Sequence, residues 1–177
     1  MKSNNPDFSR PVVMAFVAWS GTGKTTLVEK LVELASDREL VVGALKHDAH
    51  RFEIDKPGKD SHRFAAAGAN TTLIVADDKM ALVRKHDVSP LVEDLIEAHF
   101  NHCNLVLVEG WKMSSLPRIE VHRPKLKRTL LSRDETRNPH LVAVASDGPV
   151  DVDVPVLDLN NPLEILDFIL ERGWENE

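Results

Sequence analysis

The segment from residue 12 to residue 35 constrains the fold of this chain more than any other. Residues 12–18 are apolar without interruption, as in a strand that is buried on both faces of a parallel sheet. A glycine-containing loop follows, and then Leu27, Leu31 and Leu34 recur at helical spacing. A strand, a tight loop and a helix in this order present backbone N–H groups to an anion at the helix N-terminus. The segment therefore predicts a phosphate-binding loop within an α/β domain.

The residue types in this loop suit a nucleotide with its magnesium ion. Glycines let the main chain wrap closely around phosphates, Lys24 offers a charge to the β- and γ-phosphates, and Thr25 offers a hydroxyl to Mg²⁺. The alternative is a turn between a strand and a helix that binds nothing, but a Lys-Thr-Thr sequence directly after the glycines favours a ligand. The predicted nucleotide-binding residues are Ser20, Gly21, Thr22, Gly23, Lys24, Thr25 and Thr26.

An acidic residue, Glu109, follows a second apolar run at residues 105–108. Ligands of open α/β sheets gather at the carboxyl ends of the strands, where Glu109 would lie. Magnesium prefers oxygen ligands, so Thr25 and Glu109 are the predicted metal-binding residues. The alternative is an acid that only caps the following turn.

Composition sets the outer limits. A chain of 177 residues fits a single domain spanning residues 1–177, with residues 1–10 expected to be flexible. The net charge of -6 argues against nucleic acid as a partner, and a single cysteine excludes an internal disulfide. The sequence has neither an apolar run long enough to span a membrane nor a signal peptide, so we expect a cytoplasmic protein without a membrane partner.

Strands and helices alternate along the whole chain. This order predicts an α/β fold of the phosphate-loop NTPase type, with a mostly parallel sheet flanked by helices. Residues 71–75 and 81–84 predict an added β-hairpin. Two later helices have start signals: Ser89 as an N-cap before Pro90, and Asn161 as the cap of the last helix.

The most highly charged segment, residues 46–63, is too polar to be part of the core. It is either a solvated loop or a segment that closes over the phosphates, and the sequence leaves both open. Asp55 and Asp60 are candidates to position an attacking water, with Lys46 or Arg63 as candidates to neutralise phosphate charge. Asp60 is also a candidate N-cap of a short helix.

Five ordered motifs resemble those of the MobB family, the molybdopterin-guanine dinucleotide biosynthesis accessory proteins. The resemblance extends from the first strand to residues 158–160, and the segment at residues 55–61 is its most specific part. The motifs are S-G-T-G-K-T-T at 20–26, Lys46-His47 with His50, D-K-P-G-K-D-S at 55–61, A-G-A at 67–69 and L-V-E-G-W-K at 107–112.

The resemblance implies a GTP-binding homodimer with weak intrinsic hydrolysis, using GTP and Mg²⁺. Such a protein assists a partner guanylyltransferase, MobA, that joins GMP to molybdopterin in making the molybdenum cofactor. No Asn-Lys-x-Asp element for guanine is present, and Asp147, after the apolar run 141–145, is the candidate substitute. A simple Asp-Gly turn explains Asp147 equally well.

Other functions stay open at this stage. A small-molecule kinase would use the basic run 118–137 as its lid, although this run could also be a docking face or a solvated loop. A metal-insertion GTPase would use His47 or His50 as a transient ligand. His99, His102 and Cys103 form a weak zinc candidate, because a fourth ligand is missing.

Overall fold

The computed structural model describes residues 10–48, 52–133 and 138–173. It divides into two compact units, one made of Met1–His47 with Val92–Glu177 and the other of Asp48–Leu91, and each is described by itself. The prediction of flexibility for residues 1–10 lies outside the described residues except at Arg10, and the single-domain organisation stays a prediction. None of the described helices is long and apolar enough to cross a membrane.

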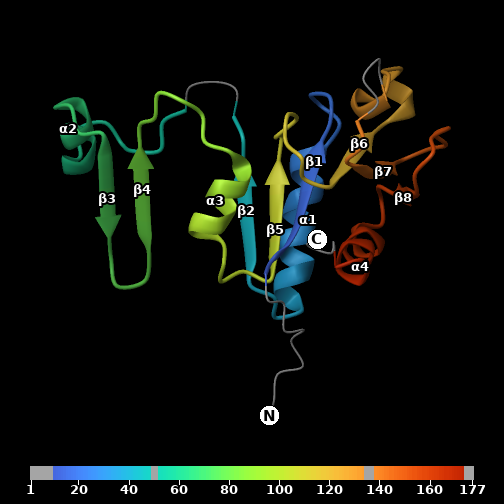
Figure 1. The fold of residues 1–177 in the computed structure, drawn as a ribbon, viewed down its shortest axis with the longest axis horizontal. Coiled ribbons are helices and arrows are strands. Elements are labelled where there is room, and N and C mark those ends of the chain that lie inside the picture. The colour runs from blue at the N-terminus through green and yellow to red at the C-terminus, as the bar shows by residue number, and fades with distance from the viewer. Residues whose placement is uncertain (1–9, 49–51, 134–137, 174–177) are drawn as a thin grey trace, which may run out of the picture. The chain divides into compact units, whose positions relative to one another are not determined.

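The first unit is built on a six-stranded sheet in the order β2-β5-β1-β6-β7-β8 (Figure 1). All neighbouring strands in it are parallel, so their carboxyl ends share one edge. This arrangement confirms the predicted parallel α/β sheet and follows from the apolar composition of the central strands. The strands are β1 Val12–Val17, β2 Val42–Lys46, β5 Leu105–Glu109, β6 Arg118–His122, β7 Leu141–Ser146 and β8 Val156–Asp158.

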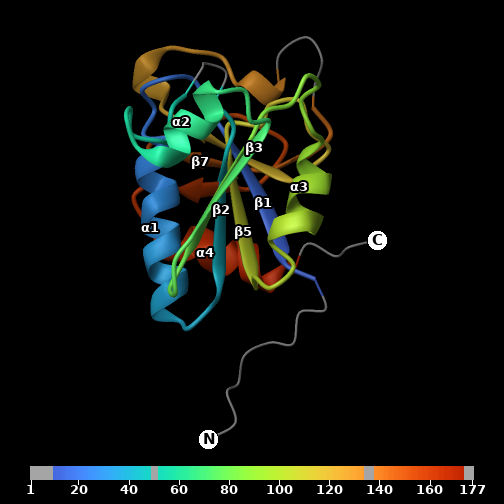
Figure 2. The same cartoon turned by 90° about the vertical axis from the view of Figure 1, so that its left-hand side faces the viewer.

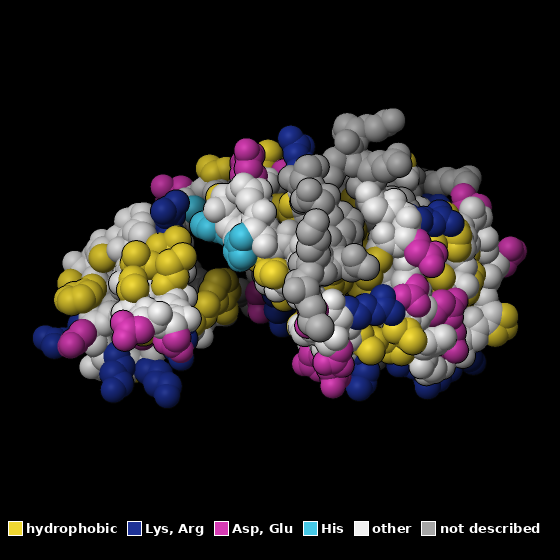
Figure 3. All heavy atoms as spheres, turned by 90° about the horizontal axis from the view of Figure 1, so that it is seen from below, with side chains coloured by type: hydrophobic (Ala, Val, Ile, Leu, Met, Phe, Trp, Pro, Cys, Tyr) yellow, Lys and Arg dark blue, Asp and Glu magenta, His cyan; other side chains and the backbone are white. Residues whose placement is uncertain are grey.

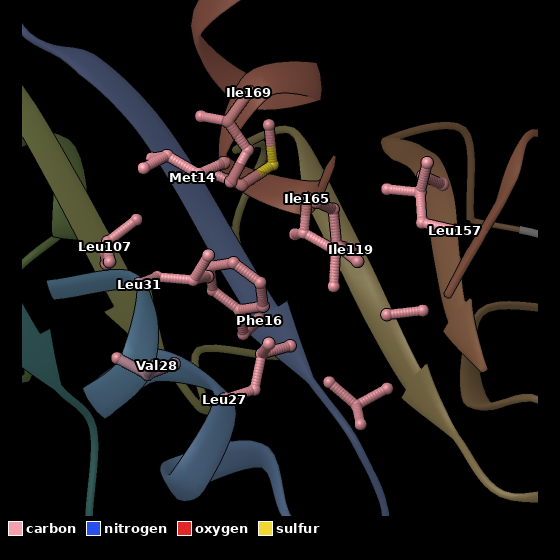
Figure 4. Packing of buried hydrophobic residues seen from close by; sticks show 14 of the residues in the cluster. Met14, Phe16, Leu27, Val28, Leu31, Leu107, Ile119, Leu157, Ile165 and Ile169 are labelled. Atoms are coloured by element: carbon pink, nitrogen blue, oxygen red, sulfur yellow. The ribbon is translucent and has the colours of Figure 1, made fainter. Parts of the chain in front are cut away.

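Helices cover both faces of this sheet. Successive side chains of a strand point to opposite faces. Phe16 packs with Leu31 and Ile165 on one face (Figure 4). Ala15 packs with Ile96 on the other. Figure 2 shows α1 and α3 on opposite sides of the strands. The helices of this unit are α1 Lys24–Asp37, α3 Val92–His99 and α4 Pro162–Glu171, with the 3₁₀ turns η1 Pro124–Leu126 and η2 Leu131–Arg133.

The two helix-start signals have different outcomes. Asn161 caps α4 as predicted, because its Oδ1 accepts a hydrogen bond from the Glu164 backbone N–H at 3.4 Å. The start predicted at Ser89 and Pro90 is wrong, since α3 begins at Val92. Val92 is buried and Pro90 is not, so the helix begins where its apolar side reaches the core.

The second unit holds α2 Asp60–Ala66 and an antiparallel hairpin of β3 Thr71–Val75 and β4 Met80–Arg84. The hairpin confirms the predicted addition to the parallel sheet. Asp60 does not cap α2 as predicted: Lys59 occupies the N-cap in an extended conformation, and Asp60 lies in the first turn. Its carboxylate still favours the helix there, because negative charge is stabilised near an N-terminus.

Candidate functional site

Residues 19–23, between β1 and α1, form a loop that we call the phosphate loop after its predicted ligand. This loop leaves its backbone donors available to an anion. Gly21 and Gly23 have φ angles of 81° and 90°, which other residues rarely adopt. A β-carbon at Gly23 would also lie 3.3 Å from Nη2 of Arg123. Gly23 is the N-cap of α1, and among the described residues no side chain caps this helix. The N–H groups of its first turn are therefore free to bind phosphate oxygens.

Lys24, Thr25 and Glu109 meet at the base of this loop. Lys24 Nζ lies 3.2 Å from Glu109 Oε1, and the Thr25 hydroxyl donates to the same oxygen at 3.1 Å. Parallel pairing of β1 with β5 sets Phe16 opposite Glu109. This pairing brings Glu109 to Thr25, which lies 84 positions earlier in the sequence. Glu109 is 8% exposed, so its charge is balanced by Lys24 in a confined setting.

This donor set fits a magnesium ion with a phosphate. A threonine hydroxyl and a carboxylate are hard oxygen ligands, and Mg²⁺ in proteins keeps several waters while binding substrate phosphates. The described residues contain no group of three or more His, Cys, Asp or Glu side chains that could hold a metal by themselves. Cys103, from the zinc candidate, is buried, and burial raises the pKa of its thiol. Magnesium binding at Thr25 and Glu109 stays a prediction.

Gly110 lies next to the charged side chains of the site, although the sequence predicted it only as one residue of the L-V-E-G-W-K motif. Its φ is 86°, and its N–H donates to the Phe16 carbonyl at 3.0 Å. A β-carbon there would lie 3.1 Å from the His47 carbonyl oxygen and 3.9 Å from Lys24 Nζ. The glycine that directly follows Glu109 at the end of β5 was the sequence feature that could have predicted this tight backbone position. The nearby ring of His47 packs against Trp111 at 4.7 Å between centroids, and His50 lies outside the described residues.

Arg123, just after β6, connects the phosphate loop to Asp147. Its Nε donates to the Thr22 carbonyl at 2.7 Å, and its Nη1 donates to Asp147 Oδ2 at 2.5 Å. Lys125 Nζ lies 3.5 Å from the same oxygen. Burial alone would raise the pKa of Asp147, but the hydrogen bond and charge of Arg123, helped by Lys125, hold it below its ordinary value. The predicted contact of Asp147 with guanine stays a prediction.

The basic run 118–137 does not form one surface. Arg118 is 2% exposed and donates to the carbonyls of Lys112 and Ser114, so it anchors a loop after β5. Arg133 pairs with Asp153 at 2.7 Å. Arg137 lies outside the described residues. Arg118 is therefore not available to a lid or a docking face formed by this run.

Trp19 begins the phosphate loop and contacts the segment that follows β6. Its Nε1 donates to the Thr129 carbonyl at 2.8 Å. The Arg128 guanidinium lies 5.1 Å from the centroid of its ring, and the Lys112 ammonium lies 5.9 Å from it. These are cation–π distances, so two cations are held beside the loop.

Asp55 and Asp60, the candidate water-positioning residues, lie in the second unit. Asp55 Oδ1 accepts from the Lys56 backbone N–H at 2.8 Å, and Asp60 lies 3.4 Å from Arg63 Nη1. These contacts are local to the segment. A catalytic role for either carboxylate stays a prediction.

Sequence relatives agree on one family. The family model described as molybdopterin guanine dinucleotide synthesis protein B, MobB, matches residues 13–147. The chain is 36% identical over 168 residues to the molybdopterin-guanine dinucleotide biosynthesis adapter protein of Escherichia coli strain K12, covering 90% of this chain and 91% of that protein. It is 35% identical over 164 residues to the protein of the same description from Haemophilus influenzae, covering 92% and 88%.

Solved structures agree on the fold. A crystal structure of molybdopterin-guanine biosynthesis protein B superposes with a TM-score of 0.69 at 24% identity, covering 92% of this chain and 99% of the other. The Bacillus subtilis MobB structure superposes with a TM-score of 0.67 at 22% identity, covering 94% and 99%.

Proposed function

This chain belongs to the family of molybdopterin guanine dinucleotide synthesis protein B, MobB, and from that membership we propose that it is an adapter in the biosynthesis of molybdopterin guanine dinucleotide. The adapter binds GTP with Mg²⁺ and hydrolyses it weakly. It assists a MobA-type guanylyltransferase that attaches GMP to molybdopterin.

One observation carries the nucleotide-binding part of the proposal: Lys24, Thr25 and Glu109 converge at the uncapped start of α1. Lys24 neutralises phosphate charge, and the first-turn N–H groups bind phosphate oxygens. Thr25 and Glu109 would hold the magnesium ion, which neutralises charge between the β- and γ-phosphates when bound. The 3.1 and 3.2 Å contacts to one Glu109 oxygen hold these three side chains together at the start of α1 and support the proposal.

Weak hydrolysis agrees with the chemistry around the loop. The pocket of about 380 Å³ that the loop forms is lined by one carboxylate, Glu109, among the described residues. That carboxylate already accepts from Thr25 and pairs with Lys24, so it is poorly suited to take a proton from water. Asp55 and Asp60 remain the proposed residues for positioning water.

The homodimer is supported by the hairpin of the second unit. Leu73 and Leu82 lie directly opposite each other across the two strands, as do Val75 and Met80, and all four side chains are exposed. Figure 3 shows hydrophobic side chains gathered on this unit. Exposed apolar faces of this kind mark protein interaction sites.

Calorimetric titration with GTP, and then with ATP, each with Mg²⁺, tests the proposal. We expect GTP to bind more tightly than ATP. The Lys24→Ala variant should lose binding but still fold and unfold cooperatively, with a lower midpoint because the nearly buried Glu109 loses its ion-pair partner. Lys79→Ala removes an exposed lysine of the second unit and is the matched control. Unchanged affinity of the Lys24 variant would contradict the site.

The same samples separate the two alternatives. A small-molecule kinase releases nucleoside diphosphate at about 1–100 per second when its acceptor is present. A metal-insertion GTPase binds metal stoichiometrically and loses it when His47 is substituted. The adapter shows neither, and its turnover rises only with the partner or the pterin.

A further inference from the structure

The order of the strands indicates on which side of the phosphate loop the nucleoside of a bound nucleotide would lie. β5 and β6 flank β1 on opposite sides, and Glu109 belongs to β5. If the terminal phosphates lie beside Lys24 and Glu109, the nucleoside leaves the loop towards the segments that follow β6, β7 and β8. Such ends of parallel strands are where open α/β sheets bind their ligands.

A cleft of about 300 Å³ lies on that side of the loop. Gly23 and Thr26 line both this cleft and the pocket of the phosphate loop, so the two hollows border the same start of α1. Its volume is at the lower end of the roughly 300–1,000 Å³ that small-molecule sites have. The walls combine aliphatic surface with a few polar groups, and they include Lys30, Arg123, Leu159, Asn160 and Pro162.

We propose that this cleft is the nucleoside subsite and that Asp158 and Asn160, at the carboxyl end of β8, recognise the hydrogen-bonding edge of guanine. The inference rests on the proposed nucleotide binding and adds to it the residues that select the base. Asn160 lines the cleft. Both the backbone N–H of Asn160, at 2.8 Å, and its side-chain Nδ2, at 3.2 Å, donate to Asp158 Oδ1.

These internal hydrogen bonds use neither Asp158 Oδ2 nor Asn160 Oδ1, which the proposal assigns to the ligand; Asn160 lines the cleft, and Asp158 lies two residues before it. Guanine presents two neighbouring donors on this edge, the N1–H and the 2-amino group, and so matches a pair of acceptors. Adenine presents the N1 acceptor beside its 6-amino donor, so one protein oxygen would face another acceptor without a hydrogen bond. An unpaired acceptor of this kind is the general basis on which such sites reject a ligand.

Backbone hydrogen bonds hold the turn that contains Asp158 and Asn160. Leu159 is 7% exposed, and its N–H donates to the Ser146 carbonyl at 3.0 Å. The Asn161 N–H donates to the Asp158 carbonyl at 3.0 Å. A turn held in this way presents its acceptors with little loss of conformational entropy on binding.

Asp147 takes a different role in this assignment. Its carboxylate holds Arg123, which in turn binds the Thr22 carbonyl of the phosphate loop. Asp147 is thus a positioning residue, and its loss changes the affinity for every nucleoside triphosphate alike. Asp158 changes the preference among bases.

Calorimetric titration of the full chain with GTP, inosine triphosphate, xanthosine triphosphate and ATP, each with Mg²⁺, tests this. We expect Asp158→Asn to lower GTP affinity about 10-fold, which corresponds to one lost hydrogen bond to a charged group. The same variant gains relative affinity for xanthosine triphosphate, because the new amide can donate to the 2-oxo group. Asn160→Ala is the second variant and lowers the ratio of GTP to ATP affinity.

Inorganic tripolyphosphate and Asp147→Asn are the controls. Tripolyphosphate has no base, so Asp158→Asn leaves its binding unchanged, and Asp147→Asn leaves the ratios among the four nucleotides unchanged. Wild-type ratios in both the Asp158 and Asn160 variants, or altered ratios in the Asp147 variant alone, would overturn the subsite while nucleotide binding stands. Failure of the wild-type chain to bind either tripolyphosphate or any nucleotide would overturn the proposed function, and the subsite with it.

Discussion

At the scale of single residues, Gly110 places a backbone constraint directly beside the charged groups of the site. Its φ of 86° favours glycine, and a β-carbon would lie 3.1 Å from the His47 carbonyl oxygen. We expect Gly110→Ala to lower the free energy of unfolding by about 1–3 kcal/mol, because it adds backbone strain and a close contact. Urea unfolding measures this change.

Gly58→Ala is the matched control for this prediction. Gly58 has the same φ of 86°, but nothing lies within 4 Å of the β-carbon position. Its substitution therefore adds backbone strain without the close contact, and the loss of stability should be smaller. Equal losses in the two variants would show that the contact with His47 adds nothing.

Asp147 makes the stability of the protein depend on pH. Arg123 and Lys125 outweigh burial and hold the pKa of Asp147 in the folded chain below its ordinary value of 3.8. The ion pair therefore contributes its full stability above pH 3.8, and the contribution is lost as the pH falls through the lower pKa of the folded state. Unfolding of the wild type and Asp147→Asn, compared between neutral and acid pH, measures this contribution.

The wild type should be more stable at neutral pH, and the difference should shrink in acid. A difference that stays constant from neutral pH to well below 3.8 would show that Asp147 does not titrate with the pair.

At the scale of elements, local patterns predicted what local forces determine. The apolar run of β1, the loop and the spacing of Leu27 and Leu31 all lie within one short segment, and the structure has the strand and the helix there. Asn161 likewise caps α4 through an N–H only three residues away.

Strand β6 shows what the sequence could not indicate. Alternation of charged and apolar residues from Arg118 to His122 is typical of a strand with one exposed face, yet all five residues are buried. Arg118 is covered by carbonyls of the loop after β5, and Glu120 accepts from the N–H groups of Leu131 and Ser132. Those partners lie in a loop and in the short 3₁₀ turn η2, neither of which has a periodic pattern in the sequence.

In the candidate site, too, features set by local sequence were predictable, whereas features set by long-range contacts were not. The position of the loop between β1 and α1 was predictable from local residue types, whereas phosphate binding by its residues stays a prediction. The link from Arg123 to Thr22 joins residues 101 positions apart, and in sequence Arg123 was one basic residue among many. Asp158 and Asn160 become candidates only when strand order places β8 on the same side of β1 as β6 and β7.

At the scale of the whole molecule, the proposed homodimer depends on the hairpin of the second unit. Val75 and Met80, opposite each other near its turn, are 67% and 71% exposed. Replacing both with lysine should shift the protein from dimer to monomer, because the like charges would repel those of the second copy and remove apolar contact. Sedimentation analysis at a fixed protein concentration measures the shift.

The GTP affinity of this double variant should stay at the wild-type value if each phosphate loop works within its own chain. Val88→Lys is the matched control, since Val88 is 82% exposed but lies outside β3 and β4. If the double variant is still a dimer, the interface does not lie on this hairpin. If the wild type is a monomer, the homodimer part of the proposal is wrong.

The position of Trp19 makes the phosphate loop its own optical reporter. Indole emission depends on nearby charges and on the hydrogen bond of the ring nitrogen, and here that ring lies beside Arg128 and Lys112 and donates to Thr129. An anion that draws either cation away changes the surroundings of the indole. If the proposed nucleotide binds, its entry should change Trp19 emission in stopped-flow fluorescence without an attached dye, and a background with Trp111→Phe and Trp174→Phe leaves Trp19 as the single tryptophan.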